Sequence, residues 1–481
     1  MTTLLNDPVT RSEAYFGGAW HATPNTFEVI HPGTLEPIGS VADCTADDAR
    51  RAIDRAEEAL KDWRRVNPYR RGQVLRTWHD LMLEHREPLA RLMTLEMGKP
   101  ITETRGEVLY AASFIEWCAE EASRIGGERV PSRFDHKRGF TASEPVGVVY
   151  AVTPWNFPAG MITRKAAPAL AAGCVMILKP AEQSPMTALY LAQLWLEAGG
   201  PANTLQVLPT SDAAAFSAPF MADSRVRKLT FTGSTAVGRL LYGQAAQTLK
   251  RVSLELGGHA PFLIFADADL ERAAREVIGS KFRNAGQTCI STNRVYVQRD
   301  VAAEFTAVLS RLTGELVLGD PLQDRTNVGP VVEQAGLDKV RAQGRGRPAR
   351  GARATVGGTH QGGLYFHPTV LTDVHPDSLI LREETFGPVA RRAFDTEQEA
   401  LTLANDSEYG LAAYAYTRDL SRAFRVAEAL EYGIVGINDG GPSAAAPQMP
   451  FGGMKNSGVG REGGHWGLEE YLETKYISLG L

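Results

Sequence analysis

The spacing of apolar side chains divides the chain into two parts. The first has a helical period, and in the long remainder strand-like runs alternate with helical segments. From Asp47 to Arg124 apolar residues recur at helical spacing, with breaks near Asn67–Pro68 and Gly98–Pro100. A helix that buries one face has this period, and Pro and Gly commonly interrupt helices. The stretch therefore predicts a layer of several helices.

After this layer, short runs rich in Val and Ile alternate with segments of helical length. Strands are expected at Val146–Val152, Val175–Leu178, Leu205–Leu208, Lys228–Phe231 and Val252–Leu254, and helices at Ile162–Ala172, Met186–Ala198 and Thr235–Gln247. Strands that alternate with helices indicate βαβ units and a mostly parallel sheet. In such a sheet, ligands bind at the carboxyl ends of the strands.

A second series of the same kind begins at Pro261–Phe265. It continues through a helical stretch at Asp269–Arg283 and a strand at Arg294–Val297, and it ends near Gly436. We therefore expect an α/β protein with two parallel-sheet domains. The segment Gly344–Gly358, rich in Arg, Gly and Pro, fits neither pattern and predicts a solvated surface turn.

Composition and charge exclude several classes of function. The length of 481 residues suits about three domains of roughly 150 residues each. Lys and Arg number 51 against 56 Asp and Glu, a net charge of −5, so no basic excess is present to bind nucleic-acid phosphates. No apolar run is long enough to span a membrane, and no apolar targeting segment opens the chain. We expect a soluble protein with neither nucleic-acid nor membrane partners.

The four cysteines are far apart and form no CxxC pair, which argues against a metal site and a disulfide framework and suits a reducing cytoplasm. Cys44, Cys118 and Cys174 have the surroundings of inert buried thiols. Cys289 differs, because Gly286 and other small or polar residues precede it and leave room for a substrate. Cys289 is therefore a candidate nucleophile, although a buried inert thiol is the commoner case.

Two further polar residues follow predicted strands. Glu255 ends an apolar strand before paired glycines, a setting that raises the pKa of a carboxylate and suits a general base. A structural ion pair is the alternative. Asn156 follows the strand Val146–Val152, where its amide could donate to an oxyanion or simply belong to a turn.

Two glycine motifs have the spacing of phosphate-binding loops. Gly458–Gly463 fits G-x-G-x-x-G, but no Val/Ile-rich strand precedes it, so a tight glycine turn is expected. Gly233–Gly238 lacks the Lys and Ser/Thr of a P-loop. It nevertheless follows the strand Lys228–Phe231 and opens a helix, where backbone N–H groups can bind phosphate.

Together these residues belong to seven motifs that occur in the order and spacing of the NAD(P)-dependent aldehyde dehydrogenase superfamily, which the chain resembles over nearly its whole length. The motifs are TPWNFP (Thr153–Pro158), ILKPAEQSP (Ile177–Pro185), FTGSTAVG (Phe231–Gly238), LELGG (Leu254–Gly258), NAGQTC (Asn284–Cys289), EETFGPV (Glu383–Val389) and PFGGMKNSGVGRE (Pro450–Glu462). The resemblance implies an enzyme that oxidises an aldehyde to an acid.

By this resemblance, Cys289 would attack the aldehyde carbon and form a thiohemiacetal. The Asn156 side chain and the Cys289 N–H would hold its oxyanion, and Glu255 would activate the water that hydrolyses the thioester. The implied cofactor is NAD, with NADP possible, because the Glu182 carboxylate suits a ribose hydroxyl better than a 2′-phosphate. Implied cofactor-binding residues are Thr153, Pro154, Trp155, Lys179, Glu182, Gly233, Ser234, Gly238, Glu384 and Phe386.

The family fold also implies a division of the chain. Residues 1–120 and 141–255 would form the NAD-binding domain, 256–440 the catalytic domain, 121–140 and 465–481 an oligomerisation element, and 441–464 a substrate loop that returns to the cofactor domain. Such enzymes are homodimers or homotetramers. The segment Tyr471–Leu481 is expected to form an edge strand that can pair across a subunit interface.

Within the family, the chain is most similar to succinate-semialdehyde dehydrogenases. In that group two arginines and a serine hold the substrate carboxylate, and Arg164, Arg283 and Ser443 match them. Either arginine could instead pair with a protein acid. The loop from Asn438 to Pro450 is longer than usual, so another acid-bearing semialdehyde or a general aldehyde remains an alternative.

Two other classes share the fold. A catalytically silent structural or binding protein is one, since fold does not determine function. The coenzyme-A-acylating branch is the other, and it generally lacks a glutamate in the LELGG position. The presence of Glu255 together with Cys289, Asn156 and Lys179 favours a hydrolytic aldehyde dehydrogenase over both.

Overall fold

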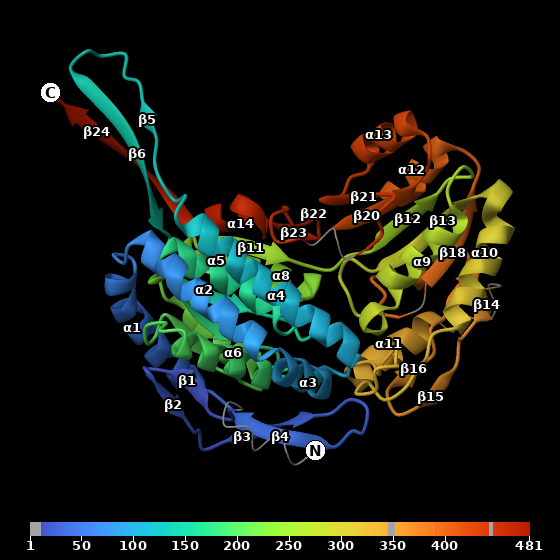
Figure 1. Cartoon of the computed structure of the whole chain (residues 1–481), viewed down its shortest axis with the longest axis horizontal. Coiled ribbons are helices and arrows are strands. Elements are labelled where there is room, and N and C mark those ends of the chain that lie inside the picture. The colour runs from blue at the N-terminus through green and yellow to red at the C-terminus, as the bar shows by residue number, and fades with distance from the viewer. Residues whose placement is uncertain (1–10, 345–351, 388, 442–445) are drawn as a thin grey trace.

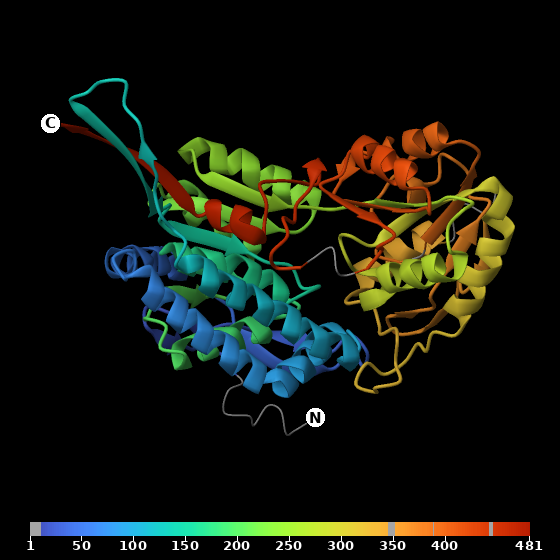
Figure 2. The same cartoon turned by 45° about the horizontal axis from the view of Figure 1, so that its top comes forward.

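The chain forms two lobes and a projecting arm (Figure 1). The structure, a computed structural model, describes residues 11–344, 352–387, 389–441 and 446–481. Each lobe is built on its own sheet, and the arm leaves the lobe that contains the N-terminal half of the chain (Figure 2). No helix in these ranges is long and apolar enough to cross a membrane.

The predicted layer of helices is present and consists of α1 (Ala46–Trp63), α2 (Pro68–Glu84), α3 (Arg86–Met97) and α4 (Ile101–Ala122). A Thr45–Asp48 capping box starts α1, and Pro68 starts α2. Gly98 ends α3 with φ +77°, a conformation that favours glycine. The breaks seen in the sequence are thus helix boundaries.

The first sheet has the strand order β2-β1-β9-β8-β7-β10-β11-β23. Its strands are β1 (Ala14–Phe16), β2 (Ala19–His21), β7 (Val148–Val152), β8 (Val175–Lys179), β9 (Leu205–Val207), β10 (Val226–Thr232), β11 (Arg251–Glu255) and β23 (Gly458–Val459), and its later helices are α5 (Gly160–Ala172), α6 (Pro185–Glu197), α7 (Ala213–Ala222) and α8 (Thr235–Ala245). The five central strands run parallel, as the βαβ pattern predicts. A short hairpin, β3 (Thr26–Ile30) with β4 (Pro37–Ala42), lies outside this sheet.

The second sheet has the order β14-β17-β18-β13-β12-β20-β21. Its strands are β12 (Ala260–Ile264), β13 (Thr292–Gln298), β14 (Arg353–Val356), β17 (Val370–Thr372), β18 (Val389–Phe394), β20 (Ala412–Tyr416) and β21 (Ile434–Ile437), with helices α9 (Leu270–Lys281), α10 (Arg299–Gly314), α11 (Gln334–Gly344), α12 (Glu397–Asn405) and α13 (Leu420–Ala429). Short pairs β15 (His360–Gly362) with β16 (Tyr365–Phe366) and β19 (Tyr409–Gly410) with β22 (Met454–Lys455) complete the lobe. The α/β class with two parallel-rich sheets is confirmed.

The arm is a three-stranded sheet of β24 (Leu472–Gly480), β6 (Lys137–Pro145) and β5 (Arg129–Val130). The range 121–140, predicted for an oligomerisation element, begins in the last turn of α4, which ends at Ala122, and stops within β6, which extends to Pro145. β6 has this length because β24 of the same chain pairs with it along its whole length, from Leu472 to Gly480. The other side of β24 remains an edge. α14 (Gly464–Glu469) precedes it.

The predictions for two glycine-rich segments, Gly458–Gly463 and Gly344–Gly358, need correction, and the second segment lies partly outside the described residues. The Gly458–Gly463 segment is more than a turn, because Gly458 and Val459 pair antiparallel with Glu255 and Leu254 and extend the first sheet. Of the Gly344–Gly358 segment, residues 345–351 lie outside the described residues, and the part from Arg353 to Val356 is a strand rather than a turn.

Candidate active site

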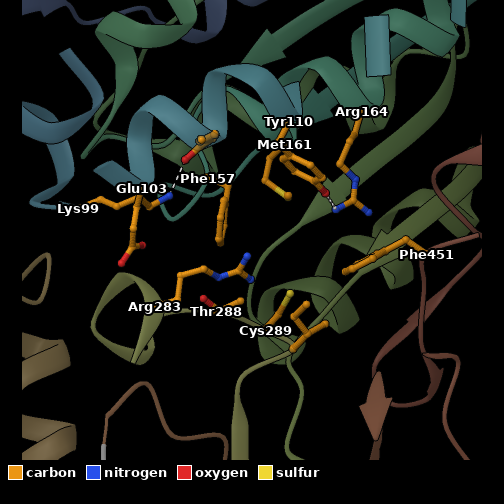
Figure 3. A pocket seen from close by; sticks show the side chains of 13 residues that line it. Lys99, Glu103, Tyr110, Phe157, Met161, Arg164, Arg283, Thr288, Cys289 and Phe451 are labelled. Atoms are coloured by element: carbon orange, nitrogen blue, oxygen red, sulfur yellow. Dashed lines mark hydrogen bonds and ion pairs between the residues drawn. The ribbon is translucent and has the colours of Figure 1, made fainter. Parts of the chain in front are cut away.

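A cavity of about 290 Å³ lies beside Cys289, lined by residues of both lobes (Figure 3). α4 and α5 supply one wall, and the loop that carries Cys289 supplies the opposite wall. The lining residues are Lys99, Glu103, Gly106, Glu107, Tyr110, Phe157, Met161, Arg164, Arg283, Thr288, Cys289, Ile290 and Phe451. The cavity thus combines an apolar lining with two arginines and a thiol, which is the composition of a small-molecule site.

The loop before Cys289 has an unusual backbone. Asn284, Ala285 and Gly286 follow one another with φ +52°, +56° and +83°, and the left-handed region costs a non-glycine residue about 1–2 kcal/mol. The loop is held by buried hydrogen bonds: the Asn284 N–H donates to Glu103 at 2.9 Å, and its side-chain amide donates to the Asn156 carbonyl at 3.1 Å. Such strain, held in place from outside, is typical of a functional loop.

The Cys289 thiol is protonated in this form of the protein. Burial raises its pKa to about 12, with Glu384 adding to the rise and Arg164 opposing it. Attack on a carbonyl therefore requires removal of the thiol proton by a base. Cys44, Cys118 and Cys174 are buried, as expected, and burial raises the pKa of all three.

Asn156 lies in the loop after β7, and the structure fixes its backbone firmly. Its carbonyl accepts from Lys99 Nζ at 2.8 Å, and its side-chain amide donates to the Gln287 carbonyl at 3.1 Å. Gln287 precedes Cys289 by two positions, so Asn156 is tied directly to the nucleophile loop. Among the described residues the amide donates no second hydrogen bond, so one N–H stays available for an oxyanion.

Glu255 ends β11 and is buried. Burial is the main cause that raises its pKa well above the ordinary range, and the nearby Glu462 adds to the rise while Arg164 opposes it. No hydrogen-bond donor among the described residues reaches Glu255 Oε2. A buried carboxyl with a raised pKa and a free oxygen fits a general base.

The two arginines of the cavity differ. Arg164 is buried, forms an ion pair with Glu462 at 2.9 Å, and lies over the Phe451 ring at 3.9 Å. Glu462 also pairs with Lys165. Arg164 thus has a protein counter-ion, as a buried guanidinium requires. Its Nε and Nη2 form no hydrogen bond with the described residues, and its role as a substrate ligand stays a prediction.

Arg283 has neither a hydrogen bond nor an ion pair within the described part of the chain. Its guanidinium lies beneath Phe157, with 5.1 Å between the charge centre and the ring, and points into the cavity (Figure 3). Its Nε is buried without a partner. Arg283 is thus the cation that the cavity offers to a ligand. Ser443, the third predicted carboxylate ligand, lies outside the described residues.

The predicted cofactor residues gather at the carboxyl ends of β7, β8, β10 and β11, as a parallel sheet requires. Register places Val152 opposite both Lys179 and Phe231, and Thr232 opposite Glu255. Thr153 continues this edge, and its N–H donates to the Lys179 carbonyl at 3.2 Å. Pro154 and Trp155 follow it directly.

Lys179 and Glu182 form one unit at this edge. Lys179 Nζ donates to Glu182 at 2.8 Å, and the lysine is nearly fully buried while the Glu182 side chain is 36% exposed. A cation and an acceptor side by side suit the two hydroxyls of a ribose.

The Gly233–Gly238 turn leads from β10 into α8. Ser234 caps α8 by accepting from the Val237 N–H at 3.3 Å. A side chain at Gly238 would collide with Leu256, since a Cβ there would lie 2.3 Å from it. The uncapped N–H groups and the dipole of this helix suit a phosphate group.

Glu384 and Phe386 lie in the segment before β18, across from the first sheet. Glu384 accepts from the Gly258 N–H at 2.9 Å, and Phe386 meets the Trp155 ring edge-on at 6.1 Å between centroids. This loop, the Lys179–Glu182 unit and the start of α8 together supply ribose and phosphate partners. The residues present therefore fit a dinucleotide cofactor.

The sequence patterns missed several residues of the site. Phe157, Tyr110 and Met161 line the cavity, and Glu107 accepts from the Ala159 and Gly160 N–H groups at the start of α5. The apolar or helical setting of Tyr110, Met161 and Glu107 marks them only as core, and Phe157 stands in the TPWNFP motif without a role assigned to it. Glu462 ends the motif Pro450–Glu462, which belongs to the family pattern. The motif does not show its partners, because Arg164 and Lys165 are distant in sequence.

Comparison with known proteins agrees with this geometry. Residues 20–477 match the model of the aldehyde dehydrogenase family. The chain is 49% identical to the NADP(+) succinate-semialdehyde dehydrogenase GabD of Escherichia coli, over 99% of this chain and 100% of that protein. It is 48% identical to a glutarate-semialdehyde dehydrogenase of Pseudomonas putida, with 99% of each covered. A crystal structure of a succinate-semialdehyde dehydrogenase from Burkholderia pseudomallei superposes with a TM-score of 0.97 at 46% identity, with 99% of each chain covered.

Proposed function

This chain belongs to the aldehyde dehydrogenase family, and we propose that it oxidises succinate semialdehyde to succinate with NAD as the hydride acceptor. One observation carries the choice of substrate. The unpaired Arg283 guanidinium and the Cys289 thiol line the same cavity of about 290 Å³. A short aldehyde with a carboxylate at its far end can meet both groups at once, because the guanidinium fork suits a carboxylate.

Each polar residue of the site has a role in this proposal. Glu255, whose charge acts on the Cys289 thiol, takes the thiol proton and passes it to solvent, and Cys289 Sγ adds to the aldehyde carbon. The Asn156 amide and the Cys289 N–H stabilise the oxyanion that forms. Bound NAD would supply the acceptor for the hydride of this carbon. Glu255 then takes a proton from the water that hydrolyses the thioester, for which its raised pKa is suited.

Cofactor contacts are assigned by position. Lys179 and Glu182 hold the adenosine ribose, Glu384 holds the nicotinamide ribose, and the Gly233–Gly238 turn with Ser234 lies against the pyrophosphate. Thr153, Pro154, Trp155 and Phe386 line the groove. The exposed Glu182 carboxylate favours NAD over NADP, whereas the E. coli relative is named for NADP(+).

The assignment of domains and subunits follows the same proposal. The lobe of the first sheet is the cofactor domain, the lobe of the second sheet is the catalytic domain, and the arm is the oligomerisation element. The free edge of β24, with Tyr476 and Leu479 exposed, supports pairing with another copy in a dimer or tetramer.

A substrate series tests the function. We would measure kcat/KM with NAD for succinate semialdehyde, glutarate semialdehyde, butanal and pentanal. The unmatched charge of Arg283 is worth about 2–5 kcal/mol, whereas one methylene is worth about 1–3 kcal/mol. The two semialdehydes should therefore lie closer to each other than to the uncharged aldehydes. Equal activity on all four would refute the semialdehyde assignment, and a preference for the longer semialdehyde would favour the function for which the P. putida relative is named.

A further inference from the structure

A lysine with no assigned role lies between the cofactor loop and the nucleophile loop. Lys281 is the last residue of α9, and its side chain is completely buried. No carboxylate in the described ranges forms an ion pair with it, which is exceptional because a buried ammonium group normally has a counter-ion. Its two hydrogen bonds go instead to Asn293 Oδ1 at 2.6 Å and to the Thr385 carbonyl at 3.1 Å.

Thr385 follows Glu384, whose carboxylate is assigned to the nicotinamide ribose. The hydrogen bond from Lys281 to the Thr385 carbonyl therefore holds the loop that carries Glu384. The other support of Glu384 is the Gly258 N–H. Asn293 in turn contacts His259 at 3.2 Å, next to Gly258 in the sequence. Lys281 and Gly258 therefore both bind the short segment Glu384–Thr385, Lys281 through the Thr385 carbonyl and Gly258 through the Glu384 carboxylate.

The same segment touches the nucleophile loop. A Cβ on Gly286 would lie 3.1 Å from the carbonyl oxygens of both Gly387 and Lys281, and φ there is +83°. The backbone of Lys281 thus packs against the loop before Cys289, while its ammonium group holds the loop after Glu384. One residue connects the two halves of the site.

We propose that Lys281 is a positioning residue for cofactor binding, which holds the Glu383–Gly387 loop in place through its hydrogen bond to the Thr385 carbonyl. This inference rests on the proposed dinucleotide site and not on the identity of the aldehyde. Electrostatics support it: Glu384 has a pKa raised mainly by burial, and Lys281 acts against that rise.

A pH dependence follows. Burial lowers the pKa of Lys281 to about 7, with Glu384 opposing the fall. If the protonated lysine favours the cofactor, NADH should bind more tightly below this pKa and more weakly as the pH rises through it. His259 and Arg294 lie on the other side of the network, and burial keeps His259 neutral by lowering its pKa well below the ordinary value. Lys339 also acts on Glu384.

The test is the equilibrium dissociation constant for NADH, followed by nucleotide fluorescence without turnover. Lys281→Met and Lys281→Gln should weaken NADH binding about tenfold, as for a lost hydrogen bond to a charged group. Wild-type affinity should fall between pH 6 and pH 9, and the affinity of Lys281→Met should stay constant over that range.

Lys228→Met is the matched control. Lys228 is equally buried, but it lies toward the start of β10 and binds Ser253 and Glu470, away from Glu384. Both Met variants should melt at lower temperature, and only Lys281→Met should lose NADH affinity. Equal loss in the two variants, or a wild-type affinity independent of pH, would overturn the role of Lys281. A wild type that does not bind NADH at all would overturn the cofactor assignment itself.

Discussion

The two walls of the cavity carry one arginine each, and the structure treats them in opposite ways. On the α5 wall, Arg164 is neutralised by Glu462 and covered by Phe451. On the nucleophile-loop wall, Arg283 has no protein counter-ion among the described residues and faces the cavity. The same side chain is therefore part of the scaffold in one wall and available to a ligand in the other.

The difference shows that residue type and position on a cavity wall do not suffice to define a ligand. A buried charge must be compensated, and the compensation decides what it can still bind. Arg164 acts on groups within the protein: its charge opposes the rise that burial causes in the pKa of Glu255 and Cys289. In the proposed function, Arg283 keeps its donors for the substrate carboxylate.

Removal of the Cys289 thiol, which lines the cavity between the two walls, should have the largest effect on activity. Cys289→Ala should abolish aldehyde oxidation, because no other covalent centre is proposed. NADH affinity should remain, as measured by fluorescence. Cys118→Ala is the matched control, since Cys118 is buried in α4 and does not line the cavity. Residual turnover above that of the buffer in Cys289→Ala would contradict the assignment of the nucleophile.

Arg164→Ala should damage the protein as a whole. Breaking a buried ion pair costs about 3–5 kcal/mol of folding free energy, and the Phe451 contact is lost too. The melting temperature should fall, and kcat/KM should drop for succinate semialdehyde and pentanal alike. A normal melting temperature with a loss confined to the semialdehyde would show that Arg164 binds substrate.

Arg283→Ala should have the selective effect. It removes the cation opposite the substrate carboxylate at a cost of about 2–5 kcal/mol in kcat/KM for succinate semialdehyde. Pentanal oxidation and the melting temperature should change little, because the Arg283 side chain forms neither an ion pair nor a hydrogen bond among the described residues and acts on Glu103 only through its charge. Arg283→Lys should recover part of the loss. An equal loss of kcat/KM on both aldehydes would show that Arg283, like Arg164, acts in the structure of the protein rather than in binding the substrate carboxylate.

The smallest effect is expected at the cofactor edge, away from both walls. Glu182→Ser should improve NADP relative to NAD in kcat/KM by about 1 kcal/mol, since the side chain is partly exposed and solvent screens its charge. Gln183→Ser, at the next and half-buried position, should leave the ratio unchanged. The ratio of semialdehyde to pentanal activity should not move in either variant. An unchanged cofactor ratio in Glu182→Ser would exclude Glu182 as the discriminating residue.

How far the site could be predicted depends on the range of the interactions. The alternation of strands and helices and the motifs around Asn156, Lys179, Glu255 and Cys289 are local, so they were readable without a structure. The register of β7, β8, β10 and β11 then places these motifs at one sheet edge, as a parallel sheet predicts. The resemblance to succinate-semialdehyde dehydrogenases marked Arg164 and Arg283 as equal candidates.

Only the tertiary structure distinguished the two arginines. Glu462 lies on a different segment, distant in sequence from Arg164, and no periodicity links them. The pairing of β24 with β6 and the contact of Lys281 with Thr385 are likewise long-range. The sequence by itself determined which chemical groups are present and on which elements they lie. The folded chain decided which of those groups compensate one another, because burial and charge pairing depend on distances in space rather than along the chain.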